Sequence, residues 1–238
     1  MRAVLVPVIP EPDSAVVVRN PSVLPTGFAQ YSIVFGAEAV FPGTDLPSEL
    51  QAAVAIRRTQ FLAGRYCAAQ AITRLCGTAA SVTVGRGARG SPVWPDGLTG
   101  SITHTGDFAS AAVASRKNVR SLGIDTEHIM ATGRARRIAS AVLVASELPA
   151  NRAIDETVWI TLVFSAKESL FKCLYPIVGR SFDYSAVAMT SIDTAAGRFA
   201  AELQHTLTAE LQAGTAIEGR FEISERYVHT GIWLTAEL

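Results

Sequence analysis

Residues 121–127 read Ser121-Leu122-Gly123-Ile124-Asp125-Thr126-Glu127, an apolar strand pattern that ends in two carboxylates. A polar turn at residues 115–118 precedes this stretch, so we expect a strand over residues 121–126. Helical patterns follow at about 132–144 and 154–175, and Pro176 is expected to end the second because proline lacks a backbone donor. Antiparallel strands are expected in the remainder, at residues 185–191, 198–203, 216–223 and 227–236.

The first half of the chain shows a similar order of strand, long helix and strands. A strand is expected at residues 31–35. A long helix is expected from a cap at Ser48 to Gly77, because apolar residues recur between them at three- and four-residue intervals. Shorter strands are expected at residues 81–84, 101–103 and 109–114. The sequence therefore predicts an α+β fold with two similar halves joined near Asn118.

Composition excludes several classes of protein. Of 238 residues, 49% are hydrophobic and 18% charged, which excludes wholesale disorder. Lys+Arg and Asp+Glu are both 21, so no global charge draws the chain to nucleic acid or an anionic membrane. The three cysteines lack paired C-x-x-C spacing, and neither a secretory signal nor a long apolar span is apparent, so we expect a soluble cytoplasmic protein with reduced thiols.

The stretch Gly85-Arg86-Gly87-Ala88-Arg89-Gly90 matches the G-x-G-x-x-G pattern of dinucleotide-binding proteins. That function needs a helix to begin directly after the glycines, so that its first amides meet the pyrophosphate. Pro92 and Pro95 follow instead, so no nicotinamide-binding site is expected. The two arginines of the loop remain candidate anion ligands.

Three carboxylates and one lysine carry the expected chemistry. Asp125 and Glu127 are two residues apart on a strand and share a face, and Glu168 and Lys172 are four apart on a helix and also share a face. Each pair alone is also typical of solvated charges, but apolar residues surround Glu168 in the sequence. Three carboxylates brought together favour a hard divalent cation, Mg²⁺ or Mn²⁺, and hence chemistry at a phosphate.

Four motifs together resemble the 4′-phosphopantetheinyl transferases of the monomeric surfactin- and enterobactin-synthetase type. That family carries W-P…G-S-x-(S/T)-H, G-(I/V)-D-x-E and F-(S/T)-x-K-E-(S/A)-x-x-K segments, which match Trp94-Pro95 and residues 100–104, 123–127 and 164–172. Residues 57–68 resemble the (K/R)RR-x-x-F-x-x-G-R-x-C-A helix of the same branch. The resemblance covers about residues 50–190.

This resemblance implies transfer of 4′-phosphopantetheine from coenzyme A (CoA) to a serine of an apo acyl or peptidyl carrier protein, with release of adenosine 3′,5′-bisphosphate. It implies Mg²⁺ ligands at Asp125, Glu127 and Glu168. It implies that Glu168 is the general base, directly or through water, and that Lys172 steadies the pyrophosphate and protonates the leaving group. It further implies contacts to the CoA 3′-phosphate, adenine and other phosphates from Arg57, Arg65, His104, Arg89 and Thr103.

We expect a monomer with two subdomains, residues 1–118 on the CoA phosphate side and residues 119–238 on the metal side. The expected arrangement is pseudo-twofold, with a long helix on a small antiparallel sheet in each subdomain and the active site in the cleft between them.

On helical geometry Arg58 is as good a phosphate ligand as Arg57. His128 is left out of the metal site because it points away from Glu127 in an extended chain.

Two functional alternatives and one partner surface complete the sequence-based hypotheses. The alternatives are a metal-dependent nucleotide phosphodiesterase, which would use water as its nucleophile, and a non-catalytic CoA-binding module. The expected partners are carrier proteins of fatty-acid, polyketide, peptide or siderophore synthases. A basic run follows the D-x-E strand and comprises Arg134, Arg136 and Arg137. This run would steer an acidic carrier toward the site, although a solvated helix face explains the three arginines equally well.

Overall fold

The structure is a computed structural model that describes residues 12–77, 83–87, 90–147 and 154–236. Backbone contacts divide the chain into two compact units. The first comprises Met1–Asn20 and Thr26–Val119, and the second Pro21–Pro25 and Arg120–Leu238. The boundary expected after residue 118 lies next to this division, but Pro21–Pro25, which we assigned to the first half, groups with the second unit.

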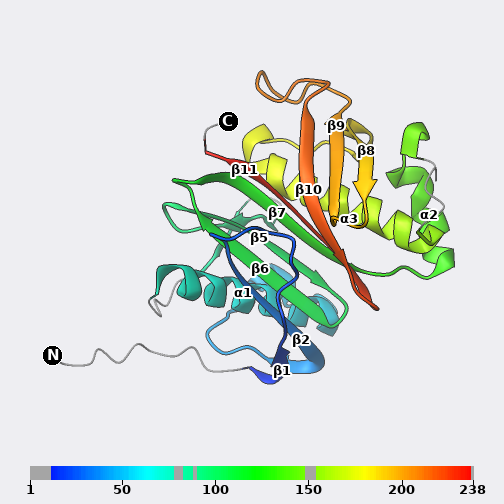
Figure 1. Cartoon of the computed structure of the whole chain (residues 1–238). Helices are drawn as coiled ribbons and strands as arrows, with labels where there is room; N and C mark the ends of the chain where they lie inside the picture. The colour runs from blue at the N-terminus through cyan, green and yellow to red at the C-terminus, as the bar shows by residue number, and fades with distance from the viewer. Residues whose placement is uncertain (1–11, 78–82, 88–89, 148–153, 237–238) are drawn as a thin grey trace. The chain divides into compact units, whose positions relative to one another are not determined.

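The first unit is one long helix on an antiparallel sheet (Figure 1). The sheet has the order β1-β2-β6-β5, and α1 packs on β2, β6 and β5. Tyr31, Ile33, Tyr66 and several small residues of α1 and β6 form the buried core between them. The elements are β1 (Asp13–Val17), β2 (Ala29–Val40), η1 (Ser48–Leu50), α1 (Ala55–Cys76), β3 (Gly85–Arg86), β4 (Pro92–Val93), β5 (Leu98–Thr105) and β6 (Phe108–Ser115).

The second unit has a five-stranded sheet in the order β7-β11-β10-β9-β8. Helix α3 packs on β11 and β10 of this sheet, and α2 packs against α3. Mixed helices and antiparallel strand pairs confirm the predicted α+β class. The elements are β7 (Val119–His128), α2 (Thr132–Val142), η3 (Ala145–Glu147), α3 (Glu156–Val178), η4 (Tyr184–Ala186), β8 (Val187–Asp193), β9 (Arg198–Leu203), β10 (Ala216–Ile223) and β11 (Tyr227–Thr235).

Two predicted helix ends are wrong. Helix α3 does not stop at Pro176 but continues to Val178, because Ile177 and Val178 pack on the core and Gly179 then supplies a left-handed cap with φ 70°. Helix α1 begins at Ala55 and is not capped by Ser48, which starts the separate 3₁₀ helix η1. The apolar spacing before Ala55 fits either kind of helix, so it could not locate the start.

The glycine-rich stretch leads into a hairpin and not into the helix that a dinucleotide-binding site requires, and the absence of that helix was expected from the prolines. Gly85 pairs with Val93 and Arg86 with Pro92 in an antiparallel ladder. This geometry is incompatible with a helix starting after the glycines, so the dinucleotide-binding alternative is excluded. Residues 81–82 of the strand expected at 81–84 lie outside the described residues. No helix in the described ranges of the chain is both long and apolar enough to cross a bilayer.

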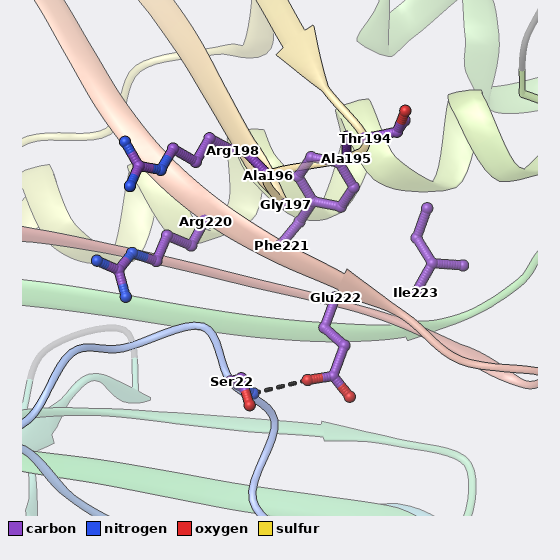
Figure 2. Close-up of a pocket in the computed structure, with 10 residues that line it drawn as sticks. All are labelled: Ser22, Thr194, Ala195, Ala196, Gly197, Arg198, Arg220, Phe221, Glu222 and Ile223. Atoms are coloured by element: carbon purple, nitrogen blue, oxygen red, sulfur yellow. Dashed lines mark hydrogen bonds between the residues drawn. The ribbon is translucent and has the colours of Figure 1, made fainter.

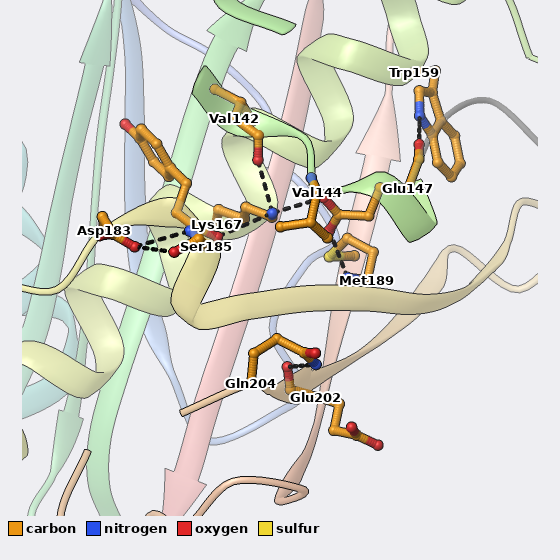
Figure 3. A network of polar contacts seen from close by, with 11 residues as sticks. Val142, Val144, Glu147, Trp159, Lys167, Asp183, Ser185, Met189, Glu202 and Gln204 are labelled. Atoms are coloured by element: carbon orange, nitrogen blue, oxygen red, sulfur yellow. Dashed lines mark hydrogen bonds and ion pairs between the residues drawn. The ribbon is translucent and has the colours of Figure 1, made fainter. Parts of the chain in front are cut away.

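A buried ion pair joins α3 to the segment after α2 (Figure 3). The Nζ of Lys167 lies 2.7 Å from Oε2 of Glu147, and both side chains are almost fully buried. The Glu147 carboxylate also accepts the backbone N–H of Val144 at 2.8 Å and of Met189 at 2.6 Å. Every charge of this network therefore has partners inside the protein.

Replacing Lys167 with methionine should lower the free energy of unfolding by about 3 kcal/mol, because the Glu147 carboxylate would stay buried without its cation. Urea unfolding followed by circular dichroism measures the loss. The double variant Lys167→Met/Glu147→Gln removes both charges while keeping an acceptor for the two amides, and it should recover most of the stability. A double variant no more stable than the single one would contradict this explanation.

Candidate functional site

Gly123 sets the distance between β7 and α3. A Cβ at this position would lie 1.9 Å from the backbone oxygen of Ser169 and 2.7 Å from the nitrogen of Cys173. Only a glycine leaves room for so close an approach of backbone to backbone. The hydroxyl of Ser121 adds a hydrogen bond to the backbone oxygen of Cys173 at 2.5 Å. The polar residues of α3 are thereby brought beside the carboxylates at the end of β7.

Asp125 is buried at this contact and both of its oxygens have partners. The Nζ of Lys172 donates to Oδ1 at 2.7 Å and to the backbone oxygen of Ile124 at 3.2 Å. The hydroxyl of Ser165 donates to Oδ2 at 2.8 Å, and the Thr230 hydroxyl lies 3.0 Å from that of Ser165. An ion pair and a hydroxyl thus fix the orientation of the Asp125 carboxylate.

The pKa of Glu127 responds to its burial and to the charged side chains around it, including Glu168. Burial, together with the negative charges of Asp125 and Glu168, raises the pKa of Glu127 to about 7, against the opposing effect of Arg134 and Lys172. The guanidinium of Arg134 lies 3.6 Å from Oε2 of Glu127. The charges of Asp125 and Glu168 thus both act on Glu127, and we refer to these three carboxylates as the cluster.

The third carboxylate accepts a hydrogen bond from a tyrosine. The hydroxyl of Tyr184 on η4 donates to Oε1 of Glu168. Burial and this hydrogen bond both raise the pKa of Tyr184, so its hydroxyl keeps the proton that it donates.

The cluster fits a hard divalent cation by its ligand chemistry. It offers only carboxylate oxygens, the ligands that Mg²⁺ prefers. Burial is the main cause of the raised pKa of Glu127, and a cation would relieve the repulsion between carboxylates that adds to it. Within the described residues, however, no three His, Cys, Asp or Glu side chains are placed to hold one ion together. Each carboxylate instead faces a donor of the protein: Lys172, Arg134 or Tyr184.

In the first unit, Arg65 and His104 flank the point where α1 meets β5. A Cβ on Gly64 would lie 2.7 Å from Cγ2 of Ile102 and 3.8 Å from Cδ2 of His104, so glycine again permits the close approach. The Arg65 guanidinium lies 5.0 Å from the centre of the Phe61 ring, and its buried Nη1 has no hydrogen-bond partner among the described residues. Burial lowers the pKa of Arg65 to about 10, with a further contribution from the positive charge of Arg86. A buried donor without a partner requires an explanation, and an anionic ligand would supply the missing acceptor.

The other predicted CoA ligands are placed less distinctively. Arg57 is exposed, and Arg58 donates to the backbone oxygen of Gln51 at 3.0 Å. Thr103 is buried, and because side chains alternate along β5 it lies on the opposite face from His104. Arg89 lies outside the described residues.

Sequence reasoning missed two hydroxyls that donate to the acids, those of Ser165 and Tyr184, and a third, that of Thr230, which contacts Ser165. Ser165 lies inside the F-S-x-K-E motif, where its spacing of three residues from Glu168 was a usable signal. Tyr184 and Thr230 reach the site only through the fold, so no local pattern marks them. Thr126, between the two acids of β7, is buried and contacts Nδ1 of His229 at 3.0 Å, which agrees with the alternation of a strand.

A cavity of about 510 Å³ lies elsewhere in the second unit (Figure 2). The turn from Thr194 to Gly197 and the strand residues Arg198, Arg220 and Glu222 line it. Oε2 of Glu222 accepts the backbone N–H of Ser22 at 2.8 Å there. None of the predicted site residues lines this cavity.

Comparisons with known proteins agree with the motifs. Residues 46–114 match the 4′-phosphopantetheinyl transferase N-terminal domain, and residues 121–230 match the 4′-phosphopantetheinyl transferase superfamily. The chain is 33% identical to the 4′-phosphopantetheinyl transferase Svp of Streptomyces mobaraensis, over 86% of this chain and 80% of the relative. It is also 33% identical to the 4′-phosphopantetheinyl transferase PptT of Mycobacterium tuberculosis, over 81% and 88%.

A third similarity is more partial. The chain is 35% identical to the enterobactin synthase component D of Escherichia coli (strain K12), over 52% of this chain and 58% of that protein. The resemblance inferred from the motifs is thereby confirmed. The chain belongs to the 4′-phosphopantetheinyl transferase superfamily and is an enzyme of that class.

Proposed function

We propose that this enzyme transfers the 4′-phosphopantetheine moiety of CoA to a serine of an apo acyl or peptidyl carrier protein, and that it depends on Mg²⁺ and releases adenosine 3′,5′-bisphosphate. The observation that supports this best is the cluster of Asp125, Glu127 and Glu168 beside Lys172, built on β7 and α3. Carboxylates and a lysine at one place suit the neutralisation and positioning of a diphosphate.

Asp125, Glu127 and Glu168 would hold Mg²⁺ or Mn²⁺, which when bound neutralises charge on the CoA diphosphate. Asp125 and Glu127 would first exchange their present partners Lys172 and Arg134 for the ion, while Glu168 would keep the hydrogen bond from Tyr184. Lys172, released from Asp125, is then available to bind a diphosphate oxygen and to stabilise the leaving phosphate. Glu168 accepts the proton of the carrier serine.

The adenosine end of CoA falls to the first unit in this proposal. Arg65 supports it most directly, because its buried Nη1 has no partner among the described residues and a 3′-phosphate would supply one. His104 lies at the same contact of α1 with β5. Arg57 would reach the same phosphate from the exposed start of α1, and the resemblance adds Arg89 and Thr103 near the adenine and phosphates.

Replacing Arg65 with glutamine should raise KM for CoA about 10- to 100-fold, because a charge-assisted hydrogen bond to the 3′-phosphate is lost. Steady-state transfer to an apo carrier measures this change. The matched control is 3′-dephospho-CoA, which lacks the group, so variant and parent should use it with equal KM. An equal loss on both substrates would show that Arg65 does not bind the 3′-phosphate.

The proposal includes the partner surface and the setting. Arg134 of α2 pairs with Glu127 and Arg136 lies 4.0 Å from Glu156, so the basic run begins next to the carboxylates. It would therefore meet an acidic carrier near the reacting serine. Siderophore, peptide and polyketide synthases supply candidate carriers. We propose a monomer in the cytoplasm, a compartment where free thiols such as those of Cys67 and Cys173 persist.

Mass spectrometry of purified apo carriers tests the function. The enzyme is incubated with CoA, Mg²⁺ and one acyl or peptidyl carrier, and the carrier should gain the phosphopantetheine mass on its serine. A carrier in which that serine is alanine should gain nothing. Consumption of CoA without any carrier would overturn the proposal and favour the phosphodiesterase. CoA binding without turnover on any carrier would favour the non-catalytic module.

A further inference from the structure

Two consecutive residues of α3 hold opposite ends of one tyrosine. The Nζ of Lys167 donates to the backbone oxygen of Tyr184 at 3.1 Å. Oε1 of the neighbouring Glu168 accepts a hydrogen bond from the hydroxyl of the same Tyr184. Since residues one apart on a helix point in directions about 100° apart, both contacts together fix the position of Tyr184 relative to α3.

The lysine end of this arrangement is held by further hydrogen bonds and an ion pair (Figure 3). Lys167 also donates to the backbone oxygen of Val142 at 2.8 Å and pairs with Glu147, and both charged side chains are almost fully buried. The indole of Trp159 donates to the backbone oxygen of Glu147 at 3.2 Å. A fully partnered buried network has little freedom to rearrange, so it provides a fixed point for η4.

The tyrosine ring is held as well. Its centre lies 5.8 Å from that of Phe164, one turn before Glu168 on α3. The carboxyl group of Asp183 accepts the backbone N–H of Ser185 at 3.1 Å and fixes the start of η4. The direction from which the hydroxyl reaches Glu168 is therefore set by the fold rather than by a mobile side chain.

We propose that Tyr184 is a positioning residue that fixes the rotamer of Glu168 and thereby assigns the proton of the carrier serine to Oε2. This assignment rests on the proposed function. Oε1 of Glu168 already accepts a hydrogen bond from the Tyr184 hydroxyl, whereas Oε2 has no hydrogen bond or ion pair among the described residues. A carboxylate pinned at one oxygen presents the other in a defined direction, which is what a general base requires.

Proton transfer from the carrier serine to Glu168 accompanies transfer of the pantetheine arm. The O–H bond of the serine breaks and its proton forms an O–H bond with Oε2 of Glu168, while the Tyr184 hydroxyl keeps its own proton and its bond to Oε1. The serine oxygen forms a bond with the phosphorus that carries the pantetheine arm. The bond from that phosphorus to the bridging oxygen breaks, and its electron pair leaves on adenosine 3′,5′-bisphosphate.

The variant Tyr184→Phe keeps the ring contact and removes only the hydroxyl, so it tests the proposal without threatening the fold. We expect kcat to fall about 10-fold, while KM for CoA and for the carrier stays within twofold, because the lost interaction orients a reacting group. We also expect Kd for Mn²⁺, measured by electron paramagnetic resonance without CoA or carrier, to rise about 10-fold. This second readout does not depend on turnover.

Tyr175→Phe is the matched control. Tyr175 lies on the same helix, its ring packs on Phe171, and its hydroxyl has no hydrogen bond among the described residues. It should leave kcat and Mn²⁺ affinity unchanged, and both variants should keep the melting temperature of the parent. A parent that transfers normally, with a Tyr184→Phe variant equal to it in kcat and in Mn²⁺ affinity, overturns the positioning role and leaves the function intact. A parent that transfers nothing, with Mn²⁺ affinity still lost in Tyr184→Phe, overturns the function and keeps the positioning of Glu168.

Discussion

Replacing Glu168 with glutamine should lower kcat for phosphopantetheine transfer about 1,000-fold, within the range that general bases contribute. Glutamine has nearly the same shape, but its amide cannot accept the serine proton and carries no charge for a cation. Under the proposed function Arg65 and His104, which belong to the first unit, bind the 3′-phosphate of CoA, so the affinity for CoA should be preserved. Single-turnover transfer to an apo carrier, followed by mass spectrometry, measures the rate.

A neighbouring acid provides the control for this prediction. Glu156 lies in the first turn of the same helix, is about half exposed and has Arg136 at 4.0 Å. Glu156→Gln should leave kcat unchanged, and thermal unfolding should show that both variants are folded. A Glu168→Gln variant that retains a tenth or more of the parental kcat would remove Glu168 from the role of general base.

Replacing Gly123 with alanine should destabilise the second unit by about 4 kcal/mol or more, which is the range of exceptional single substitutions. The added Cβ would lie 1.9 Å from the backbone oxygen of Ser169, and a backbone atom cannot yield as the end of a side chain can. Helix α3 would have to move away from β7, which would expose Leu170 and Leu174 of the core and separate Lys172 from Asp125. Urea unfolding and soluble yield measure the effect.

Gly133 is the appropriate comparison because it is also a glycine of the second unit. It lies in α2, and a Cβ there would meet only the guanidinium of Arg137 at 3.7 Å. Gly133→Ala should therefore change stability by less than about 1 kcal/mol, toward greater stability, since alanine favours helix. Equal stability of the Gly123→Ala variant and the parent would show that the backbone of α3 does not pack closely on Gly123 of β7.

Local patterns predicted most elements of the fold. The strands expected at residues 198–203 and 216–223 have the observed bounds, because alternation and turn residues at both ends are local signals. The end of α3 could not be predicted in this way. Whether Pro176 stops the helix depends on the packing of Ile177 and Val178, which are brought to the core by the rest of the chain.

The candidate site shows the same division between local and distant information. The D-x-E spacing predicted that Asp125 and Glu127 share a side of β7, and Thr126 does turn away to His229. The hydroxyls of Tyr184 and Thr230 could not be predicted, because their contacts join residues 16 and 65 positions apart. The ion pair of Arg134 with Glu127 was likewise unexpected, since the sequence suggested either a carrier-binding role or a solvated helix face.

The seat of α3 on Gly123 has a consequence for engineering this enzyme. The backbone of Ser169 and Cys173 packs on this glycine. Glu168 and Lys172 precede these two residues by one position each, so the same register of α3 fixes both the backbone contact and the position of the two charged side chains. Inserting or deleting a residue between 165 and 173 would rotate Glu168 and Lys172 away from the site, because the apolar face of α3 would still pack against the core. Libraries aimed at new carriers should therefore keep this nonapeptide constant and diversify the exposed positions of α2 instead.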